Sequence, residues 1–127
     1  MSEWRKTAIQ MIPQLRRIIE LAENKTLLWS ELVNAFFVGL DSGNTKDCGS
    51  IRDYYRWCVS SEREPLPNDV QTSAVLGFLE RFAHRPKYIT QLPNWLTYRE
   101  VAEYSWNIKY AGGESAMATI KSAYGEP

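Results

Sequence analysis

Apolar residues recur at intervals of three and four positions over most of the chain, which is the spacing of one face of an α-helix. The first such stripe runs from Leu15 to Ala22, and Pro13 sits at its first turn, where a missing N–H costs nothing. Residues 2–11 form either a short helix or a kinked extension of this one. A wider apolar arc over residues 26–41 predicts a helix that is contacted from more than one side.

A third helix follows the turn-rich segment Asp41–Gly49, which predicts a loop. Ser50, with Asp53 three positions later, resembles a capping box, although Asp is a shorter partner than the usual Glu. At 100° per residue the apolar side chains of this helix share one face: Ile51, Tyr54, Tyr55, Cys58 and Val59. The opposite face is polar: Arg52, Asp53, Arg56 and Ser60. Trp57 lies on the flank between the two faces.

The polar connection Glu62–Asp69 leads into a fourth helix, for which Asn68 is the expected N-cap. Its apolar residues keep helical spacing: Val70, Ala74, Val75, Phe78, Leu79 and Phe82. We expect it to end near His84, because Arg85 precedes a proline and is disfavoured in the helical conformation. Residues 86–96 are expected to be irregular or to form a single turn.

Thr97 and Glu100 form a T-x-x-E capping box that opens a further helix, which is expected to stop at Gly112–Gly113. Residues 114–124 predict a last short helix. No segment alternates with period two, so the sequence predicts an all-α fold, a single compact bundle of five to seven helices in one domain over residues 1–127. The expected core includes Leu28, Leu32, Phe36, Ile51, Tyr55, Cys58, Val75 and Phe78.

Composition narrows the possible functions. Aromatic residues make up 13% of the 127 positions, and a chain of this length buries roughly two-thirds of its extended surface without disulfides or metal. Fifteen basic residues balance 15 acidic ones, and the local basic clusters have acidic neighbours, which disfavours nucleic-acid binding. No apolar run approaches the roughly 18 residues of a membrane span, and no secretory signal is visible. We therefore expect a cytoplasmic protein that binds neither membranes nor nucleic acid.

Residues with catalytic or metal-binding potential are few. The single histidine, His84, is expected at a helix C-terminus, where it interacts with the helix dipole. Cys48 and Cys58 lie ten positions apart, about 15 Å along a continuous helix, which is too far for a disulfide. These three residues do not have the spacing of a zinc site. Cys58 falls on the apolar face, which favours a buried, unreactive thiol.

The sequence also lacks phosphate-binding and nucleophile-elbow motifs. The carboxylate pairs Glu62–Glu64 and Glu100–Glu103 are more typical of solvated surface than of acid–base catalysis. We therefore predict no enzymatic activity, no catalytic residue, no metal, no cofactor and no small-molecule substrate.

The order of several short motifs resembles a family of small all-helical bacterial proteins over roughly Pro13 to Tyr110. The most specific of them is I-R-x-x-Y-x-W-C, matched by Ile51, Arg52, Tyr55, Trp57 and Cys58. The others are Ile12-Pro13-Gln14-Leu15, Leu28-Trp29-Ser30-Glu31-Leu32, Asn68-Asp69-Val70 and Leu92-Pro93-Asn94-Trp95.

Members of this family stand beside secreted toxins of contact-dependent, Rhs-type or type VI systems as immunity proteins. The resemblance implies that this chain neutralises a cognate protein toxin by direct stoichiometric binding. It assigns no catalytic residue. Two alternatives stay open: a small enzyme that reverses a toxin's modification, and a nucleic-acid-binding helical domain.

A specific binder needs an anchor ringed by polar groups, with aromatic residues and Arg favoured as hot spots. The candidate partner-binding residues are Asp53, Arg56, Trp57, Glu62, Arg63 and Glu64. Their acidic members suit the basic substrate cleft of a nuclease or nucleotide-using toxin. The competing interpretation is that Trp57 packs beneath a loop.

Overall fold

The computed structural model describes residues 1–60 and 68–127 of the chain. These residues form eight α-helices: α1 (Glu3–Met11), α2 (Arg16–Leu21), α3 (Lys25–Ser42), α4 (Thr45–Val59), α5 (Asn68–Gly77), α6 (Pro86–Ile89), α7 (Tyr98–Ala102) and α8 (Ser105–Ala123). Three short 3-10 helices join them: η1 (Pro13–Leu15), η2 (Leu79–His84) and η3 (Leu92–Asn94). The described residues contain no strand, so the predicted all-α fold is confirmed.

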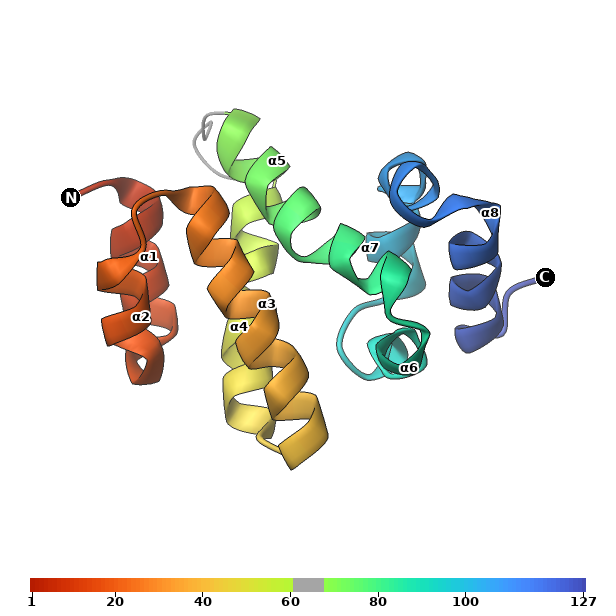
Figure 1. Cartoon of the computed structure of the whole chain (residues 1–127), viewed down its shortest axis with the longest axis horizontal. Coiled ribbons are helices and arrows are strands. Elements are labelled where there is room, and N and C mark those ends of the chain that lie inside the picture. The colour runs from red at the N-terminus through yellow and green to blue at the C-terminus, as the bar shows by residue number, and fades with distance from the viewer. Residues whose placement is uncertain (61–67) are drawn as a thin grey trace.

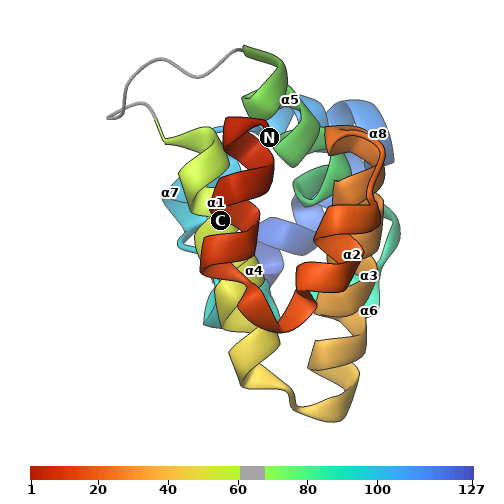
Figure 2. The ribbon, with the colours of Figure 1, turned by 90° about the vertical axis from the view of Figure 1, so that its left-hand side faces the viewer.

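The helices are arranged in successive layers along the long axis of the molecule (Figure 1). The pair α1 and α2 forms one end, and α1 packs on α4 (Figure 2). The pair α3 and α4 forms the middle, and α5 packs on both of its members. From there η2 leads to α6 and α8 at the other end, so the N- and C-termini lie at opposite ends (Figure 1).

A continuous aromatic cluster joins these layers. Trp29 of α3 stacks on Tyr54 of α4 with ring centroids 5.5 Å apart, and it also contacts Phe78 at 5.6 Å. The Phe78 ring also contacts the rings of Phe36 and Phe82, with centroids 5.0 and 5.3 Å away. Aromatic pairs in offset, tilted or edge-to-face arrangements add stability beyond the area they bury. All eight residues predicted for the core are buried: Leu28, Leu32, Phe36, Ile51, Tyr55, Cys58, Val75 and Phe78.

The predicted loop at Asp41–Gly49 is wrong, because only two of its residues lie between helices. Gly43 adopts φ +76°, a left-handed conformation that ends α3, and Asn44 caps α4 by accepting a hydrogen bond from the Asp47 backbone N–H at 3.1 Å. The predicted start of this helix at Ser50 is therefore also wrong. Gly43 is enough to end one helix and Asn44 is enough to cap the next. The remaining turn-forming residues of this segment are therefore helical.

The predicted fourth helix, Asn68 to His84, ends near His84 as expected but is divided in two. Helix α5 ends at Gly77, which lies against Trp29, and η2 follows as a 3-10 helix. A side chain at position 77 would clash with the Trp29 Cβ, so this close crossing of α5 and α3 depends on glycine.

The capping box of Thr97 and Glu100 is present, with Thr97 Oγ1 accepting from the Glu100 backbone N–H at 3.2 Å. The helix it opens is shorter than predicted, because Tyr104 leaves the helical conformation between α7 and α8. Gly113 breaks the helical conformation within α8 at φ +75°, where the sequence predicts an end. Helix α6, which the sequence does not predict as a separate helix, raises the number of α-helices among the described residues to eight, above the predicted five to seven.

Within the described residues, no helix combines the length and apolar character that crossing a membrane requires.

Candidate functional site

Helix α4 carries the three candidate partner-binding residues that the structure describes. Asp53 is exposed, and its carboxylate pairs with the neighbouring Arg52 at 3.1 Å. Trp57 is half-buried, and its ring stacks on Tyr54 with centroids 5.9 Å apart and planes 10° from parallel. The other three candidates, Glu62, Arg63 and Glu64, lie outside the described residues.

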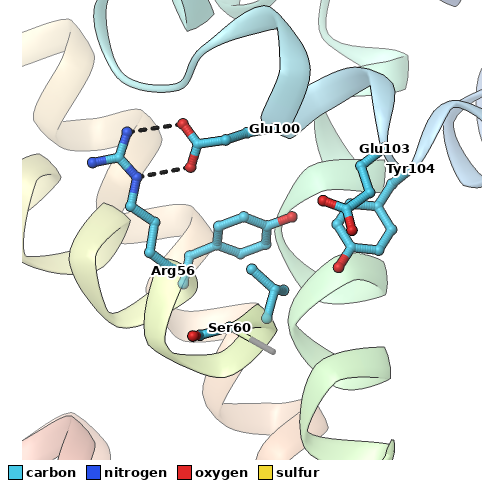
Figure 3. A pocket seen from close by; sticks show the side chains of 7 residues that line it. Arg56, Ser60, Glu100, Glu103 and Tyr104 are labelled. Atoms are coloured by element: carbon cyan, nitrogen blue, oxygen red, sulfur yellow. Dashed lines mark hydrogen bonds and ion pairs between the residues drawn. The ribbon is translucent and has the colours of Figure 1, made fainter. Parts of the chain in front are cut away.

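The side chain of Arg56 extends from α4 and contacts Glu100 of α7. Its Nε donates to Glu100 Oε2 at 2.8 Å and its Nη2 donates to Glu100 Oε1 at 2.9 Å (Figure 3). The same Nη2 also donates to the Trp95 carbonyl at 3.2 Å. The structure thus brings together one predicted contact residue and one member of the Glu100–Glu103 pair.

The charge of Glu100 is stabilised by these contacts. Burial alone would raise the pKa of this carboxyl, but hydrogen bonds from Arg56 and from the Thr97 backbone outweigh burial and hold the pKa below its ordinary value. The pKa of Arg56 is raised, chiefly by its hydrogen bonds to Glu100. The two groups therefore stay ionised as a pair.

A pocket of about 310 Å³ lies beside this ion pair, between the C-terminal end of α4 and the junction of α7 with α8. Figure 3 shows Arg56 and Glu100 on one side of it and Glu103 and Tyr104 on the other. Its lining residues are Tyr55, Arg56, Val59, Ser60, Glu100, Glu103 and Tyr104. A pocket of this size is at the lower end of the range for small-molecule sites.

Tyr55 lines this pocket and carries a buried hydroxyl that no described residue satisfies. The side chain is 1% exposed, and its hydroxyl has no hydrogen-bond partner in the described part of the chain. Burial, together with the nearby Tyr104, Glu100 and Glu103, raises the pKa of Tyr55 well above its usual range. The hydroxyl is therefore neutral, and leaving it unpaired costs about 1–3 kcal/mol.

The other polar groups of the pocket differ in their hydrogen bonds and ion pairs. The Tyr104 hydroxyl accepts from Gln71 Nε2 of α5 at 2.8 Å. Glu103 is exposed, and its carboxylate forms no ion pair or hydrogen bond with any described residue. The sequence predicts Tyr55 in the core and Glu103 on the surface, but it does not predict that the two residues line one pocket. Their proximity depends on the break between α7 and α8, which turns Tyr104 toward α5 and has no signal in the local sequence.

A second feature, on α8, is a pair of exposed aromatic residues. Trp106 is 70% exposed and Tyr110 is 78% exposed, and their rings stack with centroids 5.4 Å apart and planes 13° from parallel. The sequence places Trp106 off the apolar face of its helix but does not single out this pair. Its i, i+4 spacing on a helix is the signal that could have found it.

The residues considered for metal or nucleophilic chemistry are dispersed. Cys48 and Cys58 are both buried thiols, and burial raises the pKa of Cys48 to about 11. The Cys48 Sγ lies 3.3 Å from the Phe36 carbonyl. His84 is exposed in the last turn of η2, as expected. In residues 1–60 and 68–127, no three His, Cys, Asp or Glu side chains are grouped so that they could hold a metal ion.

Comparisons of the chain with protein-family models, curated proteins and solved structures give no match.

Proposed function

We propose that this protein is an immunity protein of the bacterial cytoplasm, which neutralises a cognate secreted toxin by direct stoichiometric binding. The observation that carries the binding role is the exposed stack of Trp106 and Tyr110 on α8. The class of partner comes from the resemblance to immunity proteins of polymorphic toxin systems.

The aromatic pair has the properties of an interface anchor. Tryptophan and tyrosine are the residue types most enriched at binding hot spots, where they bury large areas with few rotatable bonds. Stacking at 5.4 Å holds the two rings in one arrangement before a partner arrives. The entropy lost on binding is therefore smaller than for two separately mobile side chains.

The edge of α4 supports a second contact region. Asp53 presents an exposed carboxylate there, and the neighbouring Trp57 is half-buried, with its ring stacked on Tyr54. The adjoining positions Glu62, Arg63 and Glu64 complete the predicted partner-binding set. Arg56 contributes through its ion pair with Glu100, which fixes the end of α4 against α7.

The geometry favours a binder over an enzyme that reverses a toxin's modification. The oxygens of Glu100, the less exposed member of the Glu100–Glu103 pair, accept hydrogen bonds from Arg56 and, at 2.9 Å, from the Thr97 backbone N–H. A carboxylate so occupied and held ionised is a structural group rather than a general acid or base.

Co-expression with the product of the neighbouring upstream gene tests the proposal. That product should arrest growth when expressed alone, and this protein should restore growth and co-purify with it as a defined complex. A harmless upstream product, or restored growth without any complex, overturns the proposal.

A further inference from the structure

The pocket between α4 and the α7–α8 junction has an unmet hydrogen-bonding requirement at its buried side. Tyr55 lines the pocket, and its buried hydroxyl lacks a partner among residues 1–60 and 68–127. Buried polar groups in folded proteins are nearly always paired, so a ligand that pairs with this hydroxyl gains a contact that the fold alone does not supply.

The charges around the hydroxyl select the kind of ligand. The lining residues that the structure describes include two acidic side chains, Glu100 and Glu103, and one basic side chain, Arg56, which together give a net charge of −1. Arg56 is already neutralised by Glu100 in a bidentate pair, so the charge left over is that of Glu103. An anion would meet an unpaired carboxylate, and none of the lining residues within 1–60 and 68–127 supplies a free cation to offset it.

The other polar atoms of the described lining are oxygens that can accept hydrogen bonds, although its hydroxyl groups can donate as well. They include the Tyr55 hydroxyl oxygen and the carboxylate of Glu103, with the aromatic rings of Tyr55 and Tyr104 alongside. Oxygen acceptors next to aromatic rings favour a cation that donates hydrogen bonds, since such a cation is attracted both to the carboxylate and to ring faces. A divalent metal fits less well, because it prefers several oxygen ligands and Glu103 is the one unpaired carboxylate among the described lining residues.

We propose that this pocket binds an organic cation, a guanidinium or primary ammonium group, whose N–H groups donate to the Glu103 carboxylate and to the Tyr55 hydroxyl oxygen. The cation comes either from a free small molecule or from an arginine or lysine side chain of a partner protein. A volume of about 310 Å³ accommodates such a group with its alkyl chain. The proposal does not depend on the toxin-binding function, because its two contact residues, Glu103 and Tyr55, belong neither to the Trp106–Tyr110 pair nor to the partner-binding set on α4, although Arg56 of that set also lines the pocket.

An NMR titration of the full chain tests this, with amide chemical shifts followed as butylguanidinium or butylammonium is added. N-butylurea is the matched neutral probe, since it has nearly the shape of butylguanidinium without its charge. We expect saturable shifts centred on Val59, Ser60, Glu103 and Tyr104 with the two cations. The urea should bind at least about ten-fold more weakly, the factor expected when a charge-assisted hydrogen bond is lost.

Two variants and a control assign the binding to the pocket. Glu103→Gln removes the unpaired charge at an exposed position and should weaken butylguanidinium binding about ten-fold or more. Tyr55→Phe removes only the buried hydroxyl, so it should keep the fold while weakening binding several-fold. Glu114→Gln makes the same change at an exposed glutamate outside the lining and should leave binding unchanged. Equal binding of the urea, or unchanged binding in Glu103→Gln, overturns the proposal.

A capped Gly-Arg-Gly tripeptide separates the two sources of the cation. If a partner's arginine is the natural ligand, the tripeptide should bind at least as tightly as butylguanidinium. If a free cation is the natural ligand, the flanking peptide groups should weaken binding. If neither the tripeptide nor the free cations saturate the protein, the pocket is not a cation site.

Discussion

Arg56 of α4 and Glu100 of α7 form a bidentate ion pair, with N···O distances of 2.8 and 2.9 Å, across 44 positions of sequence. Glu100 also closes the capping box at the start of α7. One carboxylate thus fixes the beginning of a helix, its docking on α4 and one wall of the pocket. The pocket and the contact region at the edge of α4 therefore both depend on the Arg56–Glu100 ion pair.

A double-mutant cycle with Arg56→Met and Glu100→Gln should show coupling. The side chains are 41% and 29% exposed, so solvent screens the pair in part, and we expect a coupling of about 1 kcal/mol in the free energy of unfolding. Urea unfolding followed by far-UV circular dichroism measures it. The matched control is Arg16 with Glu20, an i, i+4 pair that is 62% and 44% exposed, for which about 0.3 kcal/mol is expected. Equal coupling in the two pairs would contradict this account of the Arg56–Glu100 contact.

The same pair predicts a dependence on pH. The pKa of Glu100 is lower in the folded protein than in the unfolded chain, so the folded state releases this proton more readily. The stabilisation is therefore present above the unfolded value of about 4.3, and it is lost as the pH falls through the lowered folded value. The difference in unfolding free energy between the wild type and Arg56→Met should shrink between about pH 7 and about pH 3. A difference that stays constant over this range would show that the carboxylate does not carry the interaction.

Two glycine-to-alanine substitutions should have opposite effects. At Gly77 an added methyl group would clash with the Trp29 Cβ, so Gly77→Ala should lower the free energy of unfolding by about 1–3 kcal/mol. At Gly49, inside α4, the nearest group that an added Cβ would meet is the tip of Arg52 at 3.9 Å. Gly49→Ala should therefore stabilise the protein by about 0.5–1 kcal/mol, through helix propensity alone. Chemical denaturation of both variants checks the pair, and a neutral Gly77→Ala would contradict the close α3–α5 crossing.

Replacement of Trp106 and Tyr110 by alanine should separate binding from folding. Both side chains are mostly exposed, so the double variant should keep its helical circular dichroism and nearly its full stability. Its affinity for the toxin should fall about 30-fold or more, as expected for the loss of a hot spot of at least about 2 kcal/mol. Val38→Ala, at a 65% exposed position of α3, is the control and should bind as the wild type does. Undiminished binding of the double variant in isothermal titration calorimetry would place the interface elsewhere.

Much of the fold was predictable because it depends on local apolar spacing. The buried face of α4, the capping box at Thr97 and the break at Gly113 each follow from a few neighbouring residues. The Asp41–Gly49 loop was predicted wrongly because turn-forming residues such as Thr45 and Asp47 are also tolerated in a helix once Asn44 has capped it.

The pocket was not predictable in this way, because it depends on contacts between distant segments. Arg56 and Glu100 each have ordinary surface patterns in sequence, and only the docking of α7 on α4 brings them together. The Tyr55 position was correctly assigned to the core, but the sequence does not show that its hydroxyl would lack a partner within the part of the chain that the structure describes. Packing geometry, rather than residue type, creates this site.

The most direct test of the binding account is the stoichiometry of neutralisation. Purified toxin at a concentration well above the dissociation constant is titrated with this protein while the toxin's activity is followed. The account predicts a linear loss of activity that ends at equimolar protein, with a complex of matching composition in native mass spectrometry. Complete loss of activity at a small fraction of an equivalent would instead indicate an enzyme that modifies the toxin, and full activity at excess protein would contradict neutralisation altogether.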